Sequence, residues 1–276
     1  MAILKNKKEL RNFLEKNVRV YNQPSFIPAD PISVPHRFSK KQDIEIAGLF
    51  AAVFSWGNRT TIIRKSNELM NLLDDAPYDF IQNHRLPDLK RLMFFKHRTF
   101  NTTDLLYFIH FLHHHYKQSD TLETAFLPAS KHTKEKKQSV MVSIETEDAE
   151  KVRSALSVFY NRFFSLDHAP HRTQKHISSP EKNSTCKRLN MYLRWMVRTD
   201  NNGVDFGIWN KIAPADLICP VDLHVARVAR GFGLISRKQT DWETAMELTR
   251  ALRGMDPADP VKYDFALFGL GVTEKY

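Results

Sequence analysis

Cysteine and glycine are both scarce in this chain of 276 residues. Its two cysteines, Cys186 and Cys219, are too few for a disulfide framework or for a four-thiolate zinc or iron–sulfur site. We therefore expect reduced thiols and a cytoplasmic protein. The nine glycines are few for a large α/β protein, which uses glycine at many turns, so the composition favours helices.

Long hydrophobic runs are missing as well. No uninterrupted apolar stretch approaches membrane-spanning length. The segment from Met1 to Arg19 is charged throughout and lacks the apolar core of a signal peptide. We expect neither a signal peptide nor a membrane partner.

Positive charge is in excess. The formal net charge is +10 at pH 7, which favours a polyanionic partner, usually nucleic acid. A basic soluble protein with no such partner would show the same excess, so charge alone makes nucleic-acid binding plausible and no more.

Apolar residues recur mostly at helical spacing. From residue 42, the small residues Ala47, Gly48, Ala51 and Ala52 alternate with large apolar ones, which predicts a buried helix that a second helix can approach closely. After Lys187, apolar residues follow the spacing of one helix face, at Leu189, Tyr192, Leu193, Met196 and Val197. With no convincing strand and no repeat, the chain is predicted to be all-α.

A charged segment with few structural signals interrupts this pattern. Residues 131–150 are rich in lysine and glutamate, and we interpret them as a flexible insertion. The helical pattern resumes at Ala149.

Two residues, Lys187 and Asp222, each stand at the start of a predicted helix. An aspartate there usually caps backbone amides, and a lysine is usually solvated. If both instead face one cleft, an unprotonated lysine can act as an amine nucleophile, and the carboxylate can take its proton. Such a pair suits attack on the anomeric carbon of a nucleotide to give a Schiff base.

The surroundings of these two residues resemble the helix-hairpin-helix DNA glycosylases of the endonuclease III type. The segment from Pro220 to Val228 resembles the Val-Asp-Thr-His motif of that family, with Leu223 in place of threonine, and Lys187 and Asn190 match the spacing of its lysine and asparagine. Together with the helix from Ile44 to Phe54, the turn Trp56-Gly57-Asn58-Arg59 and the tail 262–269, the pattern is similar to the DUF2400 proteins, a bacterial branch of unknown function. The resemblance spans most of residues 42–276.

This resemblance implies a fold and an activity. It implies a two-lobed all-α fold with a cleft between the lobes. Residues 1–40 and 220–276 would form one lobe, and residues 41–219, with a hairpin at 183–198, the other. Lys187 would be the Schiff-base nucleophile and Asp222 its activator in a base-excision glycosylase with abasic-site lyase activity. Its partner would be double-stranded, damaged DNA, bound by a monomer. No iron–sulfur or other cofactor and no metal is expected, because the four-cysteine loop of endonuclease III is missing.

Two further groups of residues follow from the same resemblance. Polar and basic residues would contact DNA: Asn58, Arg59, Lys96, Arg98, Arg172, Lys175, Asn183, Ser184, Thr185 and Arg227. Aromatic residues would form the base pocket or a wedge between bases: Trp56, Phe95, Trp195 and Trp209. For each aromatic residue taken alone, packing in the core is the competing interpretation.

The hairpin departs from the family pattern and leaves alternatives open. Its two glycines are replaced by Asn183, which tolerates left-handed geometry, and Thr185, which does so poorly. This favours a second hypothesis, a non-catalytic DNA-binding module on the same scaffold. A third, a metal-dependent hydrolase, would use histidines 113–115 or 168, 171 and 176, but no spacing there matches a known ligand motif.

Overall fold

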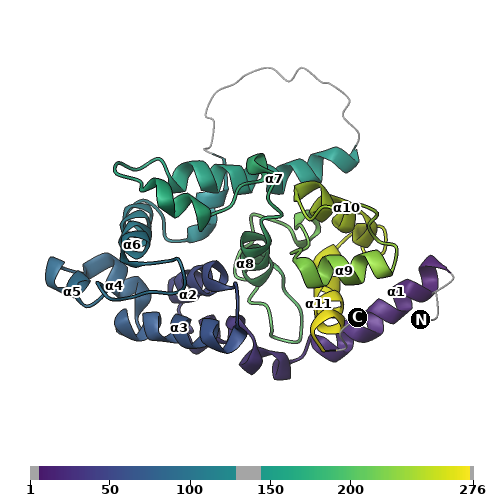
Figure 1. Cartoon of the computed structure of the whole chain (residues 1–276), viewed down its shortest axis with the longest axis horizontal. Helices are drawn as coiled ribbons and strands as arrows, with labels where there is room; N and C mark the ends of the chain where they lie inside the picture. The colour runs from purple at the N-terminus through teal and green to yellow at the C-terminus, as the bar shows by residue number, and fades with distance from the viewer. Residues whose placement is uncertain (1–5, 129–143, 274–276) are drawn as a thin grey trace, which may run out of the picture.

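The protein is all-α, as the periodicity predicts. The computed structural model describes residues 6–128 and 144–273, and over this part the only β pairing is an isolated bridge between His97 and Phe100 (Figure 1). Short 3-10 turns join the α-helices: α1 (Lys7–Tyr21), α2 (Lys41–Phe54), α3 (Arg59–Leu72), α4 (Pro77–Asn83), α5 (Leu86–Lys90), α6 (Thr102–Tyr116), α7 (Ile144–Phe163), α8 (Lys187–Val197), α9 (Leu223–Gly231), α10 (Trp242–Arg253) and α11 (Tyr263–Thr273).

The sequence predicts a flexible insertion at residues 131–150, but the end of this segment is helical. Residues 144–150 belong to α7, so this helix begins before the expected start at Ala149. Residues 131–143 lie outside the described part of the chain. Within that part, no helix combines the length and apolarity needed to cross a membrane.

Helix α8 lies at the centre of the molecule. In Figure 1, helices α2–α6 lie to one side of it, and α1, α9, α10 and α11 lie to the other. The predicted small-residue face of α2 packs on α8: a Cβ atom at Gly48 would stand 3.0 Å from Met196 Cε and 3.2 Å from the Tyr192 ring. The absence of a side chain at Gly48 therefore allows α2 and α8 to approach closely.

A buried carboxylate on α2 fixes the surrounding elements. Glu45 is fully buried and accepts hydrogen bonds from the Tyr116 hydroxyl (2.8 Å), the Thr121 hydroxyl (2.5 Å), the Leu122 amide (2.9 Å) and the Trp209 indole (2.7 Å). Four donors satisfy a charge that would otherwise be costly to bury. This contact joins α2 to α6 and to the connection that follows α8.

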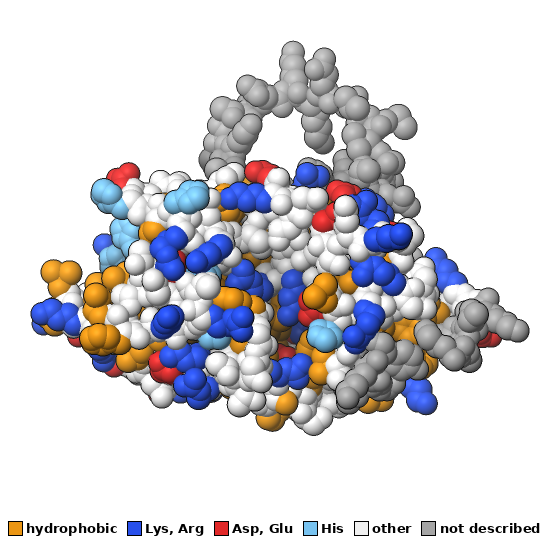
Figure 2. All heavy atoms as spheres, viewed as in Figure 1, with side chains coloured by type: hydrophobic (Ala, Val, Ile, Leu, Met, Phe, Trp, Pro, Cys, Tyr) orange, Lys and Arg blue, Asp and Glu red, His pale blue; other side chains and the backbone are white. Residues whose placement is uncertain are grey.

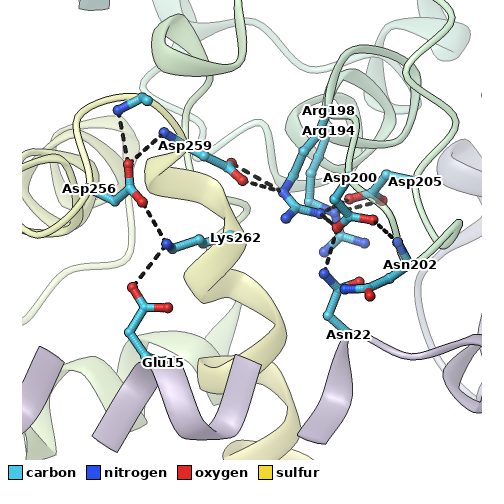
Figure 3. Close-up of polar contacts among 11 residues, drawn as sticks. Glu15, Asn22, Arg194, Arg198, Asp200, Asn202, Asp205, Asp256, Asp259 and Lys262 are labelled. Carbon is cyan, nitrogen blue, oxygen red and sulfur yellow. Dashed lines mark hydrogen bonds and ion pairs between the residues drawn. The ribbon is translucent and has the colours of Figure 1, made fainter. Parts of the chain in front are cut away.

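Two buried arginines fix the other end of α8 (Figure 3). Arg194 binds Asp205 (3.3 Å) and Asp264, the second residue of α11. Arg198 binds three carboxylates, those of Asp200 (2.6 Å), Asp205 (3.1 Å) and Asp259 (2.9 Å). The pKa values of both guanidinium groups are raised, because the neighbouring carboxylates outweigh the effect of burial. These pairs join α8 to α11 and to the turn before it.

Helix α11 in turn lies directly against α1. A Cβ atom at Gly269 would stand 2.4 Å from the ring of Tyr21, so this position has no room for a side chain. Because α11 also packs on α9, the position of α9 depends on this contact.

A second buried carboxylate fixes the segment that leads into α8. Asp104, near the start of α6, is bound by the Arg172 guanidinium and the Thr173 hydroxyl (2.7 Å), and His176 Nε2 lies 3.3 Å away. Burial alone would raise the pKa of Asp104, but hydrogen bonds from His176, Thr173 and the Asn101 amide outweigh it and lower the pKa to about 2.

We expect Asp104→Asn to destabilise the protein by about 3 kcal/mol at pH 7, because it leaves Arg172 and His176 without their buried anion. Since the folded-state pKa lies below the ordinary value, this stabilisation is present above about pH 4 and is lost as the pH falls towards 2. Denaturant unfolding at several pH values would measure both effects. The exposed carboxylate Asp79 is the control, and Asp79→Asn should change stability by less than about 0.5 kcal/mol.

Gly269→Ala should also destabilise the protein, by about 1–3 kcal/mol, because the added methyl group meets the Tyr21 ring at 2.4–2.5 Å. Gly254→Ala is the matched control: its nearest neighbour is the flexible end of Lys7 at 3.1 Å. Equal melting temperatures for the two variants would contradict the close approach of α1 and α11.

Candidate active site

A pocket of about 1020 Å³ lies where the turn after α2 meets the first turns of α8 and α9 and one face of α11. Figure 2 shows Lys and Arg side chains on both sides of a hollow near the middle of one face. Lys187 and Asp222 both line this pocket, together with Asp30, Arg59, Arg194, Asp264 and Phe268. The structure therefore brings together the two residues that the sequence singled out.

Lys187 and Asp222 form an ion pair across the pocket. The Lys187 Nζ atom lies 3.7 Å from Asp222 Oδ2, and the two side chains are 23% and 27% exposed. The other oxygen, Oδ1, accepts the backbone amides of His224 (2.9 Å) and Val225 (3.0 Å) and so caps α9. The helix cap holds one oxygen of Asp222 in place while the other faces the lysine.

The segment before Lys187 contains two residues with left-handed backbone geometry. Its first element is a 3-10 turn, Pro180–Lys182, and Asn183 follows in the left-handed region with φ 53°. The second left-handed residue is Cys186, with φ 50°, and not Thr185 as the family pattern predicts. Threonine thus avoids the conformation that its branched side chain disfavours. No side chain caps the N-terminus of α8, which begins at Lys187.

Two more carboxylates lie deep in the pocket. Asp264 is 5% exposed; burial raises its pKa to about 6, although Arg194 and Lys187 act in the opposite direction. Asp30 is 6% exposed, and burial raises its pKa as well, against Arg194, Arg59 and Lys187. Both carboxylates thus stand in the field of the guanidinium of Arg194, whose own pKa the surrounding carboxylates raise.

Aromatic rings form two parts of the pocket wall. On one side, the Arg98 guanidinium lies 4.5 Å from the centre of the Trp56 ring. On the other, the Arg59 guanidinium lies 5.1 Å from the centre of the Phe268 ring, which also contacts Phe26 edge to face. Each wall combines a flat ring with a cation.

Three of the four predicted aromatic residues are core residues and do not line the pocket. Phe95 (2% exposed) stacks on Phe54, and Trp195 is fully buried. The Trp209 indole donates to the buried carboxylate Glu45. Because these rings are enclosed by the core, they cannot meet a base, and Trp56 alone of the four lines the pocket.

The predicted DNA-contact residues divide into four groups. Asn58, Arg59 and Arg227 line the pocket, although Asn58 also caps α3 and Arg227 donates to the Gly271 carbonyl. Lys96, Arg98, Lys175 and Asn183 are exposed outside the pocket, and Ser184 and Thr185 are half-buried next to Lys187. Arg172 differs from the rest, because its guanidinium already binds Asp104, Asn101 and the Thr99 carbonyl.

The sequence-based prediction missed several pocket residues. Asp30 lies in a proline-rich connector, Arg194 on α8 outside the apolar face that the sequence predicts, and Asp264 and Phe268 in the tail used only for the resemblance. Phe94, the neighbour of the predicted wedge residue Phe95, is 94% exposed. The i, i+4 spacing of Asp264 and Phe268, which places both on one face of α11, was a usable signal.

The histidines of the described residues show no metal-binding arrangement. Among the described residues, no group of three or more His, Cys, Asp or Glu side chains could hold a metal ion. In the histidine run, His113 contacts the Ile81 carbonyl and His115 the Thr121 carbonyl, so their rings point to different partners.

The chain matches the model of a known protein family over most of its length. The model of the family described as a protein of unknown function (DUF2400) matches residues 30–273. No curated protein and no solved structure gave a match. The matched range includes Asp30, Lys187, Asp222 and Asp264, and it spans most of the chain. The chain therefore belongs to the DUF2400 family.

Proposed function

We propose that this protein is a DNA glycosylase of the helix-hairpin-helix type, which removes an extruded base and cleaves the resulting abasic site through a Schiff base. One observation carries the proposal: the Lys187 amine lies 3.7 Å from the Asp222 carboxylate at a pocket of about 1020 Å³. This volume is at the upper end of ligand pockets, which are roughly 300–1,000 Å³.

The chemistry assigns one role to each member of the pair. Lys187 first loses a proton to become a nucleophile, and Asp222 Oδ2 is placed to accept it. The amine then attacks C1′ of the extruded nucleotide: a bond from Nζ to C1′ forms, and the glycosidic bond breaks. The base leaves with the electron pair of that bond and takes up the proton that Asp222 accepted. Asp222 is thereby ionised again, and its carboxylate stabilises the positive charge that develops on the sugar.

The lyase step follows from the same adduct. The sugar ring opens as O4′ takes a proton, which gives an iminium between C1′ and Nζ. Loss of a C2′ proton then expels the 3′ phosphate with the C3′–O3′ electron pair. Water finally attacks C1′, which releases the sugar aldehyde and restores the Lys187 amine.

The surface around Lys187 suits a DNA backbone. The N-terminus of α8 has no side-chain cap, so its first amides and the positive end of its dipole are available to a phosphate. Asn183 is exposed four residues before Lys187. On this proposal, residues 1–40 with 220–276 form one lobe, residues 41–219 form the other, and the pocket is the cleft between them.

An exposed ring supplies a wedge for extrusion. Phe94 is 94% exposed and lies four residues before Arg98, whose guanidinium stacks on the pocket residue Trp56. An apolar side chain inserted between base pairs lowers the cost of removing a nucleotide from the stack. We therefore assign to Phe94 the wedge role that the sequence suggested for Phe95.

Borohydride should trap a covalent adduct between the wild-type protein and a duplex that contains an abasic site. Lys187→Gln should abolish this adduct, because the glutamine amide is not a nucleophile. Gel electrophoresis after reduction measures the adduct. Lys117→Gln, at an exposed lysine beyond α6, is the matched control and should leave trapping unchanged. Undiminished trapping by Lys187→Gln would exclude this lysine as the nucleophile.

Asp222→Asn separates the two functions of the aspartate. The asparagine oxygen still accepts the amides of His224 and Val225, so the cap of α9 and the melting temperature should be retained. Adduct formation should slow about 10²–10⁴-fold, since the proton acceptor is lost.

If DNA binds in a salt-sensitive manner and the wild type forms no adduct on any damaged duplex, the protein is the non-catalytic DNA-binding module instead.

Phe94→Ala should slow adduct formation on an abasic duplex about 10-fold, because a wedge acts only where a stack must be opened. On a single-stranded abasic oligonucleotide, the variant and the wild type should react equally fast. Leu86→Ala is the control, since Leu86 is also highly exposed (81%) but lies on α5. An equal loss of rate on both substrates would argue against the wedge role.

A further inference from the structure

From the floor of the pocket we infer the class of base that it accepts: a guanine-type base, held by Asp264 and Asp30 through the two neighbouring donors of its Watson–Crick edge. This inference rests on the proposed glycosylase function and adds its specificity.

The two carboxylates each keep one oxygen without a partner in the described chain. Asp264 Oδ2 accepts from Arg194, while no contact occupies Oδ1. Asp30 Oδ1 accepts from the Ile32 amide (3.1 Å), while no contact occupies Oδ2. Both residues are more than nine-tenths buried and both line the pocket. Neither of these oxygens is sealed inside the protein, so both are acceptors open to the pocket, which favours a ligand that brings N–H donors.

The common bases differ in the donors that they can offer. Guanine carries N1–H and the N2 amino group side by side, which fits two carboxylate acceptors. Adenine and cytosine carry one amino group beside a bare ring nitrogen, and thymine and uracil carry one N–H between two carbonyl oxygens. Carboxylates only accept when ionised, so a bare nitrogen or a carbonyl facing them would be repelled. An oxidised guanine keeps both donors and remains a substrate on this basis.

The position of Asp264 supports this assignment. The bond from Arg194 holds the carboxylate in one orientation, and Arg194 is itself fixed by Asp205. Burial raises the pKa of Asp264 only to about 6, so the group is ionised at pH 7.5 and accepts two donors. One helical turn further along α11, the Phe268 ring lines the same pocket and offers a stacking surface.

Single-turnover base release at pH 7.5 tests the inference. Matched duplexes would carry 8-oxoguanine, thymine glycol, uracil or hypoxanthine, which has N1–H but no N2 amino group. We expect 8-oxoguanine to be released at least about 10-fold faster than either pyrimidine, and hypoxanthine to fall between them. Asp264→Asn should slow release of 8-oxoguanine about 10-fold or more, because an amide presents N–H groups in place of one acceptor oxygen.

Trapping on an abasic duplex separates this inference from the proposed function, since no base is present there. Asp264→Asn should lower the ratio of 8-oxoguanine release to abasic trapping by about 10-fold or more, whereas Asp256→Asn, at a carboxylate paired with Lys262 outside the pocket, should leave that ratio unchanged. Faster release of a pyrimidine, no release of 8-oxoguanine, or an equal loss of trapping and release in Asp264→Asn would overturn the guanine assignment and leave the glycosylase standing. No abasic adduct with the wild type would overturn both.

Discussion

The ion pairs of Arg194 and Arg198 are the contacts on which the geometry of the site depends. Arg194 lies in α8 and Arg198 directly follows it, and they bind carboxylates from the connection after α8, from the turn before α11 and from the start of α11. Helix α11 packs on α9, whose cap is Asp222. The two residues of the candidate active pair are thus far apart in sequence but joined through one chain of packed helices.

Asp222 shows that a structural role and a chemical role need not compete. A helix cap uses one carboxylate oxygen, and the second remains free to face Lys187. The cap also gives the carboxylate a fixed orientation, which a freely rotating surface aspartate would lack. Positioning of this kind is what a proton acceptor requires, because its efficiency depends on geometry before it depends on pKa.

The sequence was informative wherever a short-range pattern determined the structure. Helical periodicity correctly predicted an all-α fold and a small-residue face that another helix approaches closely; the structure shows that this helix is α8, which packs at Gly48. Local motifs also identified Lys187 and Asp222, which the structure brings into one pocket. By contrast, Asp30, Arg194 and Asp264 come close together only in the folded chain. The periodicity of a single helix does not predict which residues of other segments will lie near it. The burial of Phe95 and exposure of Phe94 depend on one turn, whose direction composition could not predict.

The two carboxylates deep in the pocket are less completely hydrogen-bonded than the buried carboxylate elsewhere in the molecule. Asp30 and Asp264 each bury a carboxylate with one unpaired oxygen, an arrangement that weakens the folded state. Glu45 provides the contrast within the same molecule, since four donors surround that buried carboxylate. The protein thus satisfies one buried carboxylate fully and leaves two incompletely bonded beside an open cavity. A ligand that donates hydrogen bonds to these two carboxylates can offset their free-energy cost. On this argument, the missing donors belong to the substrate, and the specificity of the pocket follows from the hydrogen bonds that the protein leaves unmade.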